Sequence, residues 1–548
     1  MSGSVGYDHG APAAGAIVSA TSLATATHSG VAVADAAGAF HLALPPGEYA
    51  LTVAANQGSA LLEKHSAPDL DLRIKLSRAC HVLRGCTRRH GPATQVRAER
   101  WSTADGEVYY GATDPRGCFT LCVPDGYYMV SLGGDVVSQP LDVHVAATTE
   151  LQLDGFLASA VKNPPPKVSQ ISADLTGLIA DIKSRDPVII GMGEATHGTR
   201  EFTTLRGELS LALVRQADVQ LLLFEIDAIS ATALDDYVNG GDVDIARAVV
   251  ALGFWVTDTY EFLHFLELVR TYNAGSTRKV HIWGVDVQNT QLPVTTITDH
   301  VTHLTDDEAA ALAAAATRRG KAVHDLPAPQ RAALAALLSR LGTPHGSSRD
   351  DLLLAVAARS LALQLHYLDG DTLGQYRRRR DAGMAELATF ITTQMRVRRA
   401  CLWAHDGHIT KDGDSPMLGR NLAQNPVLRY YGIGFYLYEG SARAWDGGAK
   451  IGVIPNTISA AAPYMVEGAI MRATGMPAVA WLPLDKLPRA LSDWLDTPRL
   501  VREVGATYVD DQVETLRRIR EAFDAIVVIR TGHDSTPTAT GVRTAKHD

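Results

Sequence analysis

Apolar runs of strand length alternate with longer amphipathic stretches in the C-terminal two thirds of the chain. The stretches between these runs carry the apolar spacing of helices that bury one face. Such alternation is typical of an α/β domain with a largely parallel central sheet. The runs are PVIIGMG (187–193), LLLFEID (221–227), KVHIWGVDVQ (279–288), RACLWA (399–404), YYGIGFYLY (430–438) and AIVVIR (525–530).

A helical insertion interrupts this alternation at about residues 303–395. The Ala-rich stretch DDEAAALAAAATRRG (306–320) predicts a helix, and the loop GTPHGSSRDD (342–351) separates it from the next helical run. We expect the insertion to form a lid or arm over a crevice of the α/β domain. Within it, the run 377–380 of four arginines is expected by default to lie on a solvated helix face.

An internal repeat occupies the N-terminal part of the chain. DAAGAFHLALPPGEY (35–49) and DPRGCFTLCVPDGYY (114–128) align without a gap, and seven of their fifteen positions are identical. Asp-x-x-Gly and Pro-x-Gly are turn sequences, and Phe-x-Leu alternates like a half-buried strand. The repeat predicts two small all-β sandwiches, at 1–75 and 76–153. Both resemble carboxypeptidase regulatory-like modules of transthyretin or Ig type, which implies a role as spacers or in domain or protein contacts.

A proline-rich linker is predicted to follow the repeats at 154–167. It contains three consecutive prolines at 164–166, which favour extended polyproline geometry. The α/β domain is then expected to cover 168–535, and a tail to cover 536–548. The predicted fold class is therefore multidomain, with two β-sandwiches before an α/β domain.

Composition narrows the classes of partner. The 548 residues carry a net charge of −9, which argues against nucleic acid, because binding to phosphates needs a basic surface. No run of 18 uncharged apolar residues predicts a membrane helix. The first 30 residues lack Lys and Arg, unlike the basic start of a secretory signal, and five cysteines are an odd number and too few for a disulfide framework. We therefore expect a cytoplasmic protein with free thiols. A secreted protein whose signal has been removed would have the same start, so a secreted origin stays open.

Four of the five cysteines fall in the second repeat. Cys80 and Cys86 are separated by five residues, and Cys118 and Cys122 by three, which are not the short spacings of zinc knuckles. Burial as small apolar side chains is therefore favoured over a zinc site. Cys401 lies within an apolar run and is expected to be buried and inert.

Polar side chains gather where the predicted strands end. Because parallel strands end at one edge of a sheet, these residues are expected to meet in the crevice where α/β folds bind ligands. Carboxylates and imidazoles in one crevice indicate either general acid/base catalysis or a metal site. The residues are Glu194 and His197, Glu225 and Asp227, Asp286 and Gln288, and His405 and His408.

Simpler roles are open for some of these residues. Acidic side chains at strand ends also cap the helices that follow, and a single His such as His281 is usually structural. Sequence signatures of serine α/β-hydrolases, P-loop proteins, dinucleotide-binding folds and HExxH metalloproteases are absent from the chain.

Several ordered blocks between about 168 and 532 resemble the erythromycin esterase-like family. The blocks are GMGEATHGTREF, LLLFE, GFWVTDTYEFLHFLELVRTYN, GVDVQ, RRDAGMA and LWAHDGHITK. The resemblance places catalytic groups on Glu194, His197, Glu225 and His405. It places substrate-binding groups on Arg206, Trp255, Asp258, Asp286, Arg380 and His408.

One position departs from the family pattern. Asp406 stands between the late histidines, where the family usually has Asn. An added negative charge there is expected to raise the pKa of His405 and keep its ring protonated. This leaves open whether His405 acts as a neutral acceptor or as a charged donor.

The resemblance implies a hydrolase without metal or other cofactor, in which His197 activates water and His405 or Arg206 stabilises the oxyanion. Apolar walls from Phe254, Trp255 and the insertion favour a bulky, largely apolar ester or lactone of a secondary metabolite of polyketide or macrolide type. As an alternative, Arg206 and Arg380 recognise a carboxylate on the acyl group. A metal-dependent member and a non-hydrolytic one, such as a cyclase, an acyl transferase or a succinoglycan-type assembly protein, are the rival functions.

Overall fold

The computed structural model describes residues 1–538, apart from short gaps. The gaps are 8, 23–27, 56–57, 68–70, 77–79, 88–93, 101–107, 134–135, 139, 168–170, 172–173, 318–325, 345, 347, 368–372, 413–416, 447–451 and 509–513.

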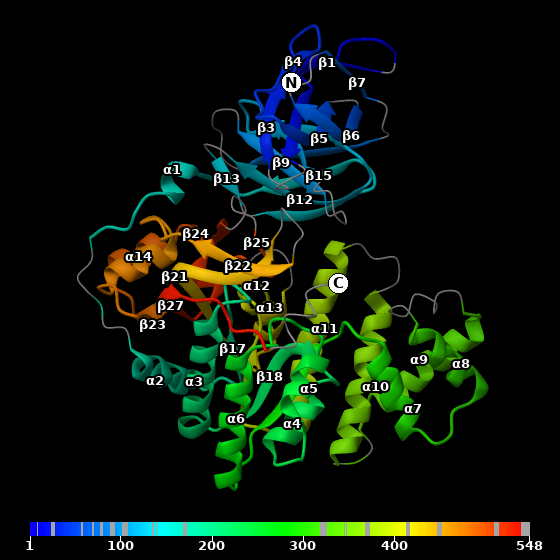
Figure 1. Ribbon diagram of the computed structural model, residues 1–548, viewed down its shortest axis with the longest axis vertical. Helices are drawn as coiled ribbons and strands as arrows, with labels where there is room; N and C mark the ends of the chain where they lie inside the picture. The colour runs from blue at the N-terminus through cyan, green and yellow to red at the C-terminus, as the bar shows by residue number, and fades with distance from the viewer. Residues whose placement is uncertain are drawn as a thin grey trace.

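The N-terminal region contains two β-units of the same construction (Figure 1). In the first β-unit (1–76), a four-stranded sheet has the order β3-β2-β5-β6 and a three-stranded sheet has the order β4-β1-β7. Side chains of both sheets form one apolar core. Its strands are β1 (Ser2–Tyr7), β2 (Ile17–Ser22), β3 (His28–Val33), β4 (Ala39–His41), β5 (Gly47–Ala55), β6 (Gly58–Ala67) and β7 (Leu72–Leu76).

The second β-unit (81–157) repeats this strand order as β10-β9-β12-β14 and β11-β8-β15, again around its own core. The strands β13 and β16 form a further antiparallel pair at the end of this unit. The strands are β8 (His81–Thr87), β9 (Gln95–Arg100), β10 (Val108–Ala112), β11 (Cys118–Val123), β12 (Gly126–Gly133), β13 (Val136–Ser138), β14 (Leu141–Val145), β15 (Thr149–Leu153) and β16 (Gly155–Leu157).

The repeated sequence motif folds identically in both β-units. Asp35 Oδ1 accepts hydrogen bonds from the backbone two and four residues later, and Asp114 does the same. The glycine of each turn has a φ of nearly +80°, a conformation that favours glycine. The hydroxyls of Tyr49 and Tyr128 each donate to the carbonyl four residues earlier, over 2.9 Å. Five of the seven sequence identities thus lie at the two turns, and the other two are the buried Phe and Leu between them.

The expectation of free thiols is wrong for four of the five cysteines. Cys80 bonds to Cys122 and Cys86 bonds to Cys118. Cys86 and Cys118 lie directly opposite each other on the antiparallel strands β8 and β11. Spacing along the chain does not reveal such cross-strand neighbours, so neither free thiols nor a zinc site describes this unit. Cys401 is free and buried, as expected, and burial raises the pKa of its thiol to about 12.

A nine-stranded sheet forms the centre of the α/β domain. Its main order is β19-β18-β20-β17-β21-β27-β23, with β22 and β25 paired to β21. The pairs from β19 to β27 are parallel, whereas β22 and β23 are antiparallel to their neighbours. The strands are β17 (Ile189–Met192), β18 (Val219–Asp227), β19 (His281–Asp286), β20 (Arg399–Trp403), β21 (Tyr431–Asp446), β22 (Val453–Ile458), β23 (Val479–Pro483), β25 (Thr507–Tyr508) and β27 (Ala525–Gly532).

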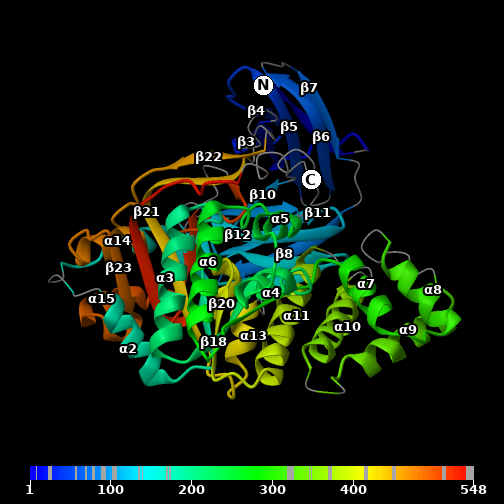
Figure 2. The ribbon, with the colours of Figure 1, turned by 60° about the horizontal axis from the view of Figure 1, so that its bottom comes forward.

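Helices cover this sheet, and β24 (Arg499–Arg502) pairs with β26 (Glu514–Arg517) beside it (Figures 1 and 2). Helices α8 to α10 of the insertion extend away from the sheet, whereas α11 packs on β19. The helices are α1 (Ala158–Val161), α2 (Leu175–Arg185), α3 (Arg200–Gln216), α4 (Thr232–Val238), α5 (Ile245–Ala251), α6 (Tyr260–Gly275), α7 (Gln291–His300), α8 (Asp306–Ala315), α9 (Ala328–Leu341), α10 (Arg349–Tyr367), α11 (Leu373–Gln394), α12 (Asp406–Ile409), α13 (Leu418–Ala423), α14 (Val466–Ala473), α15 (Arg489–Leu495) and α16 (Ile519–Ala522).

These elements confirm the coarse prediction of a β-rich N-terminal region before an α/β domain with a mixed sheet. All six predicted strands are present, and the sequence patterns missed β22 to β26. None of the helices in the described part of the chain is both long and apolar enough to cross a membrane.

Candidate active site

The strand order places the predicted site residues along one edge of the sheet. Asp286 ends β19, Glu225 lies near the end of β18, His405 follows β20, and Glu194 follows β17. These four strands are consecutive neighbours in the order β19-β18-β20-β17. The side chains therefore meet because adjacent parallel strands end at the same edge.

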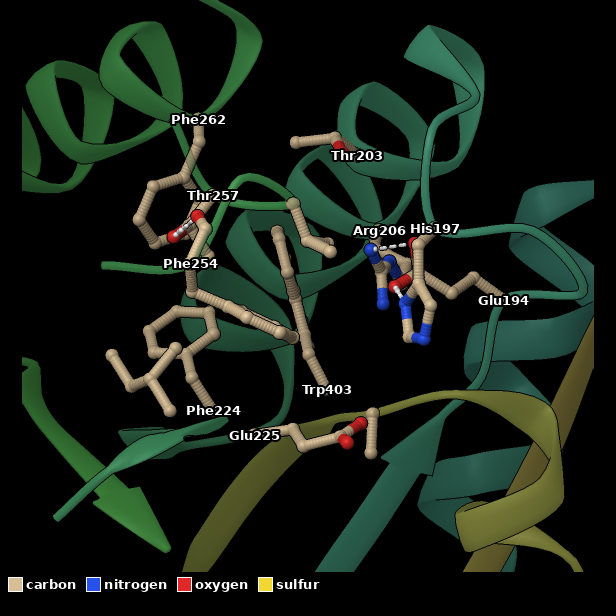
Figure 3. A pocket seen from close by; sticks show the side chains of 13 residues that line it. Glu194, His197, Thr203, Arg206, Phe224, Glu225, Phe254, Thr257, Phe262 and Trp403 are labelled. Atoms are coloured by element: carbon tan, nitrogen blue, oxygen red, sulfur yellow. Dashed lines mark hydrogen bonds and ion pairs between the residues drawn. The ribbon is translucent and has the colours of Figure 1, made fainter. Parts of the chain in front are cut away.

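His197 and Glu194 form a pair on the loop between β17 and α3. Glu194 Oε1 lies 3.0 Å from His197 Nδ1, and its Oε2 accepts a hydrogen bond of 2.6 Å from Arg206 Nη2 (Figure 3). Because a carboxylate only accepts, Nδ1 carries the proton and Nε2 of His197 is left as an acceptor. Glu194 is thus held from both sides, by an imidazole and a guanidinium.

Local sequence explains this placement. A Cβ on Gly198 would lie 2.0 Å from the carbonyl oxygen of Arg443, so only glycine allows the loop to approach β21. Arg206 shares the buried face of α3 with Phe202, Leu209 and other apolar residues. Its guanidinium lies 4.7 Å from the ring centre of Trp403, so aromatic and carboxylate groups surround this buried cation.

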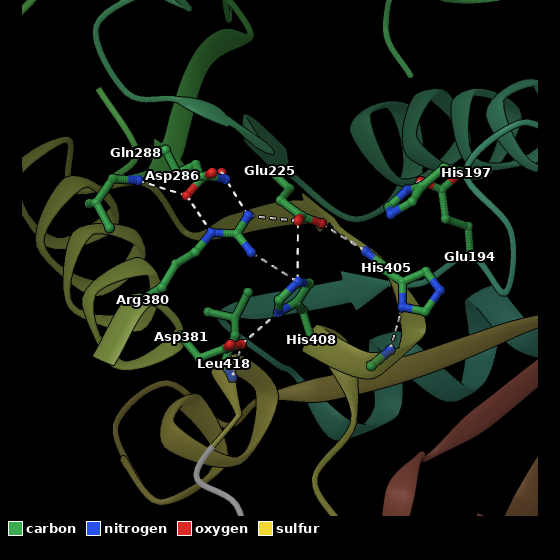
Figure 4. Close-up of polar contacts among 12 residues, drawn as sticks. Glu194, His197, Glu225, Asp286, Gln288, Arg380, Asp381, His405, His408 and Leu418 are labelled. Atoms are coloured by element: carbon green, nitrogen blue, oxygen red, sulfur yellow. Dashed lines mark hydrogen bonds and ion pairs between the residues drawn. The ribbon is translucent and has the colours of Figure 1, made fainter. Parts of the chain in front are cut away.

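His405 faces the same space from the end of the neighbouring strand, β20. Its ring centre lies 4.9 Å from that of His197 (Figure 4). Nδ1 of His405 accepts a 3.0 Å hydrogen bond from the backbone N–H of Gly407, so the proton of the neutral ring is on Nε2. That Nε2 is buried and has no hydrogen-bond partner in the described residues. Burial, followed by the proximity of His197 and His408, holds the pKa of His405 well below its usual value.

The expected effect of Asp406 on His405 is therefore wrong. The Asp406 side chain points away from the imidazole, and its Oδ1 accepts a hydrogen bond of 3.1 Å from the backbone of Phe435. A Cβ on Gly193 would lie 1.6 Å from this oxygen, which explains the glycine there. Complete burial, with Glu503 nearby, raises the pKa of Asp406 well above its usual value. Burial thus favours the uncharged form of Asp406, and the lowered pKa of His405 favours a neutral ring that donates from Nε2.

A second network of charged side chains surrounds Glu225. Arg380 on α11 binds Asp286 through Nε at 2.8 Å and Nη2 at 2.7 Å, and Nη2 also lies 2.9 Å from Glu225 Oε1. The other oxygen of Glu225 accepts a 3.0 Å hydrogen bond from the backbone N–H of His405. Gln288 donates to Asp286 over 2.7 Å. Glu225 therefore connects the insertion to the loop that carries His405.

His408 is the charged histidine of the site. Its Nδ1 lies 2.7 Å from Asp381 Oδ1, and its Nε2 lies 3.2 Å from Glu225 Oε1 (Figure 4). Burial lowers the pKa of His408, but Asp381 and Glu225 outweigh it and raise the pKa to about 10. Burial likewise raises the pKa of Glu225, but His408 and Arg380 bring it well below the usual value. Asp381, fully buried, belongs to this network although we did not single it out as a site residue.

A narrow cavity opens beside His197. Figure 3 shows Glu194, His197 and Arg206 on one side and Phe224, Phe254 and Phe262 on the other, with Trp403 between them. Aromatic walls from Phe224, Phe262 and Trp403 were missed because their apolar runs look like ordinary core. The lining residues are Glu194, His197, Thr203, Arg206, Phe224, Glu225, Ile226, Phe254, Val256, Thr257, Phe262, Trp403 and Ala404.

The expectation that the insertion forms a wall of this cavity is wrong for its described residues. The described residues of the insertion contribute no side chain to this lining; the insertion supplies Arg380 and Asp381 beneath it instead. Arg206 and Arg380 both pair with protein carboxylates. The ring centre of Trp255 lies 6.4 Å from that of His197. Asp258, on the same loop between α5 and α6, is buried.

Asp227 and His281 have structural roles outside the catalytic groups. Asp227 Oδ1 accepts from the backbone of Ile229 and Ser230, which makes it the cap of the turn after β18. His281 pairs with Asp235 at 3.2 Å, away from the site. In the part of the chain that the structure describes, no three His, Cys, Asp or Glu residues are grouped so as to hold a metal ion.

Comparison with known proteins identifies the α/β domain. The family model described as erythromycin esterase matches residues 214–532, which is more than half of the chain. This range includes Glu225, Arg380 and His405 and begins after the loop that carries His197.

Solved structures give the same picture of the fold. A Bacillus cereus protein is 21% identical, with a TM-score of 0.54, over 69% of this chain and 97% of its own. A succinoglycan biosynthesis protein is 19% identical, with a TM-score of 0.55, over the same shares of the two chains. A mutant of the erythromycin esterase EreC in its open conformation is 20% identical, with a TM-score of 0.47, over 65% of this chain and 93% of its own. The first two show that the α/β domain has a fold known from other proteins.

Proposed function

The chain belongs to the erythromycin esterase family, and from this premise we propose that it hydrolyses a carboxylic ester or lactone with water activated by His197. The observation that carries the proposal is the pairing of Glu194 with His197 Nδ1, opposite the unpartnered Nε2–H of His405. A base and a hydrogen-bond donor on two sides of one space are what water attack on a carbonyl requires.

His197 is the general base in this proposal. Glu194 fixes the ring so that Nε2 faces the cavity, and Arg206 keeps Glu194 in place. Nε2 takes one proton from water as the water oxygen bonds to the carbonyl carbon. The same proton then passes to the leaving alkoxide when the carbon–oxygen bond of the ester breaks. His197 ends in its starting state, and no covalent enzyme intermediate forms.

His405 stabilises the oxyanion that forms during this attack. Its buried Nε2–H is a neutral donor, and the low pKa of the ring keeps it neutral through the physiological range. A donor already oriented in a dry site stabilises developing charge more than water does. Glu225 supports this role, because it binds the His405 backbone and is itself neutralised by His408 and Arg380.

The cavity supports an ester with an apolar group next to its carbonyl. Four aromatic rings, those of Phe224, Phe254, Phe262 and Trp403, line the side of the cavity away from Glu194. The space between these rings is narrow, so we infer that it takes one small apolar segment of a larger molecule. We infer a bulky, largely apolar ester or lactone of polyketide or macrolide type, with Trp255, whose ring centre lies 6.4 Å from that of His197, as a further contact. Asp258 would support the loop that carries Trp255.

A test in H₂¹⁸O separates hydrolysis from the rival functions. The full-length protein is incubated with macrolides, acylated polyketides and acylated oligosaccharides, and products are analysed by mass spectrometry. Hydrolysis incorporates one ¹⁸O into the acid product, whereas cyclisation or acyl transfer incorporates none. Turnover restricted to the oligosaccharides would overturn the substrate class and favour the role in polysaccharide assembly that the succinoglycan biosynthesis protein bears in its name.

A further inference from the structure

The last described residues of the chain run beside two loops that flank the site. Residues 533–538, which we call the C-terminal strap, directly follow β27 and lie beyond the range that the family model matches. The strap runs beside two loops. One is the loop 196–200, which carries His197, and the other is the loop 254–259, which carries Phe254 and Trp255.

Main-chain hydrogen bonds hold the strap to the first loop. The backbone N–H of Ser535 donates to Gly198 over 2.9 Å, and that of Arg200 donates to His533 over the same distance. Thr199 and Asp534 form an isolated antiparallel bridge. Glu201 then binds His533 twice, with 2.7 Å to the backbone N–H and 2.7 Å to Nδ1.

The same strap is bonded to the second loop. Tyr260 donates its backbone N–H to Thr536 over 2.9 Å, and Thr536 donates to Glu261 over 3.1 Å. Thr259 and Pro537 form another antiparallel bridge. At the end of the strap, the Thr538 hydroxyl donates to the carboxylate of Asp258, and both residues are buried.

Between these contacts lies a buried guanidinium. Arg443 stands over the Trp255 ring at 5.9 Å, with the carboxylates of Asp258 and Asp534 among its electrostatic neighbours. Asp534 belongs to the strap and Asp258 to the second loop, so the cation attracts both toward the same point. The strap, the two loops and β21 thus form one packed layer around His197 and Trp255.

We propose that the C-terminal strap is a positioning element of the site, which fixes the His197 loop relative to the Phe254–Trp255 loop. Its residues do not touch the cavity, so they act through the loops that do. The Thr538 end sets the position of the aromatic wall, and the His533 end sets the position of the loop that carries the base.

Hydrogen–deuterium exchange tests this without any substrate. In the full-length protein, Thr538→Val removes the hydroxyl that binds Asp258 while keeping the shape of the side chain. Exchange in peptides covering 253–262 should rise about tenfold, because a buried carboxylate loses its partner and local opening becomes easier. Thr538→Ser keeps a hydroxyl and should restore the exchange rate of the native protein. Thr392→Val is the matched control, because Thr392 is also buried and its hydroxyl donates to the Ala388 carbonyl within α11.

A second variant covers the case in which Thr538→Val does not fold. The His533 side chain is 59% exposed, so His533→Ala removes the pairing with Glu201 without opening a core. Exchange should then rise in peptides covering 194–201 while β18 stays protected. Unchanged exchange in both loops, or an equal rise throughout the α/β domain, would overturn the proposal.

A kinetic measurement adds a readout that a purely structural role does not move, and this part rests on the proposed hydrolase function. With p-nitrophenyl hexanoate as the probe, Thr538→Val should raise KM about fivefold or more and change kcat less, because it loosens the wall rather than the base. His533→Ala should mainly lower kcat. If the native protein did not cleave the probe, the hydrolase proposal would lose support. The exchange experiment would still test whether the strap positions the two loops. Equal effects of both variants on kcat and KM would contradict the division between the two ends.

Discussion

Arg380 and Asp286 form a two-point ion pair that joins the helical insertion to the edge of the central sheet. Arg380 lies on α11 and Asp286 ends β19, and two nitrogens of the guanidinium reach the two carboxylate oxygens at 2.8 and 2.7 Å. The same guanidinium contacts Glu225, so one buried cation compensates two buried carboxylates. The insertion therefore stabilises the site through the contacts of Arg380 with Asp286 and Glu225.

Removing the Arg380 cation should lower the free energy of unfolding. Arg380→Gln leaves Asp286 and Glu225 with less compensation, and we expect the free energy of unfolding to fall by about 3 to 5 kcal/mol. Arg380→Lys keeps the charge but not the planar two-point contact, so it should lose less. Chemical denaturation measures both variants, with Arg378→Gln on the same helix as the control, expected to cost under about 1 kcal/mol. Equal losses for Arg380→Gln and Arg378→Gln would contradict the compensation.

Loss of the base should remove activity without unfolding the protein. His197→Ala is expected to reduce kcat at least about a hundredfold, because general base catalysis contributes that much or more. The melting temperature should stay close to that of the native protein, since the His197 side chain lies at the cavity surface. His264→Ala, at a histidine that is 69% exposed, controls for loss of an imidazole elsewhere. Near-native turnover by His197→Ala on a verified substrate would remove it from the mechanism.

Strand ends were the informative signal in the sequence. Glu225 inside an apolar run and Glu194 beside His197 indicated a polar sheet edge, and the parallel order of β17, β18 and β20 brings them together. The direction of each side chain was not predictable, because it depends on contacts with distant segments. Asp406 turns toward Phe435 rather than its neighbour His405 for this reason.

The sequence also did not reveal which residues on distant elements bond to each other. The bond between Cys86 and Cys118 follows from the register of β8 and β11, which spacing along the chain does not reveal. The arginine run on α11 resembles a solvated helix face until α11 is packed against β19, where Arg380 becomes internal. Both errors come from reading a segment alone.

The raised pKa of Asp406 gives a pH-dependent prediction. Its pKa is raised in the folded protein, so the folded state binds a proton more tightly than the unfolded state does. Stability from this group is therefore lost as the pH rises above the unfolded pKa of about 4 toward the folded value. Asp406→Asn keeps the acceptor for Phe435 and does not titrate.

The Asp406→Asn variant and the native protein should be about equally stable near pH 4. By pH 7 the variant should be more stable by about 1 to 3 kcal/mol, because the cost of holding the acid protonated or burying its charge is gone. Denaturation at both pH values measures the difference, in which other titrating groups cancel. A difference that stays constant with pH would mean that Asp406 is ionised in the folded protein.

The boundary of the α/β domain can be located by truncation, because the segment before the three prolines is bonded to that domain. Arg499 is buried, and its Nη1 donates to the carbonyls of Ala160 at 2.7 Å and Val161 at 3.1 Å. The Trp494 indole donates to Asn163 over 2.9 Å. Val161 is fully buried in the core of the α/β domain.

We therefore expect a chain that begins at Ala158 to fold without the β-units. A chain that begins at Pro166 should fold with about 2 to 4 kcal/mol less stability, since it loses a buried valine and leaves Arg499 without these acceptors. Urea denaturation of the two truncated chains measures this difference, and Val161→Ala in the longer one separates the apolar part from the polar part. Equal midpoints would place the boundary at the prolines. Aggregation of both chains, with cooperative unfolding only at full length, would mean that the β-units are required for the α/β domain to fold.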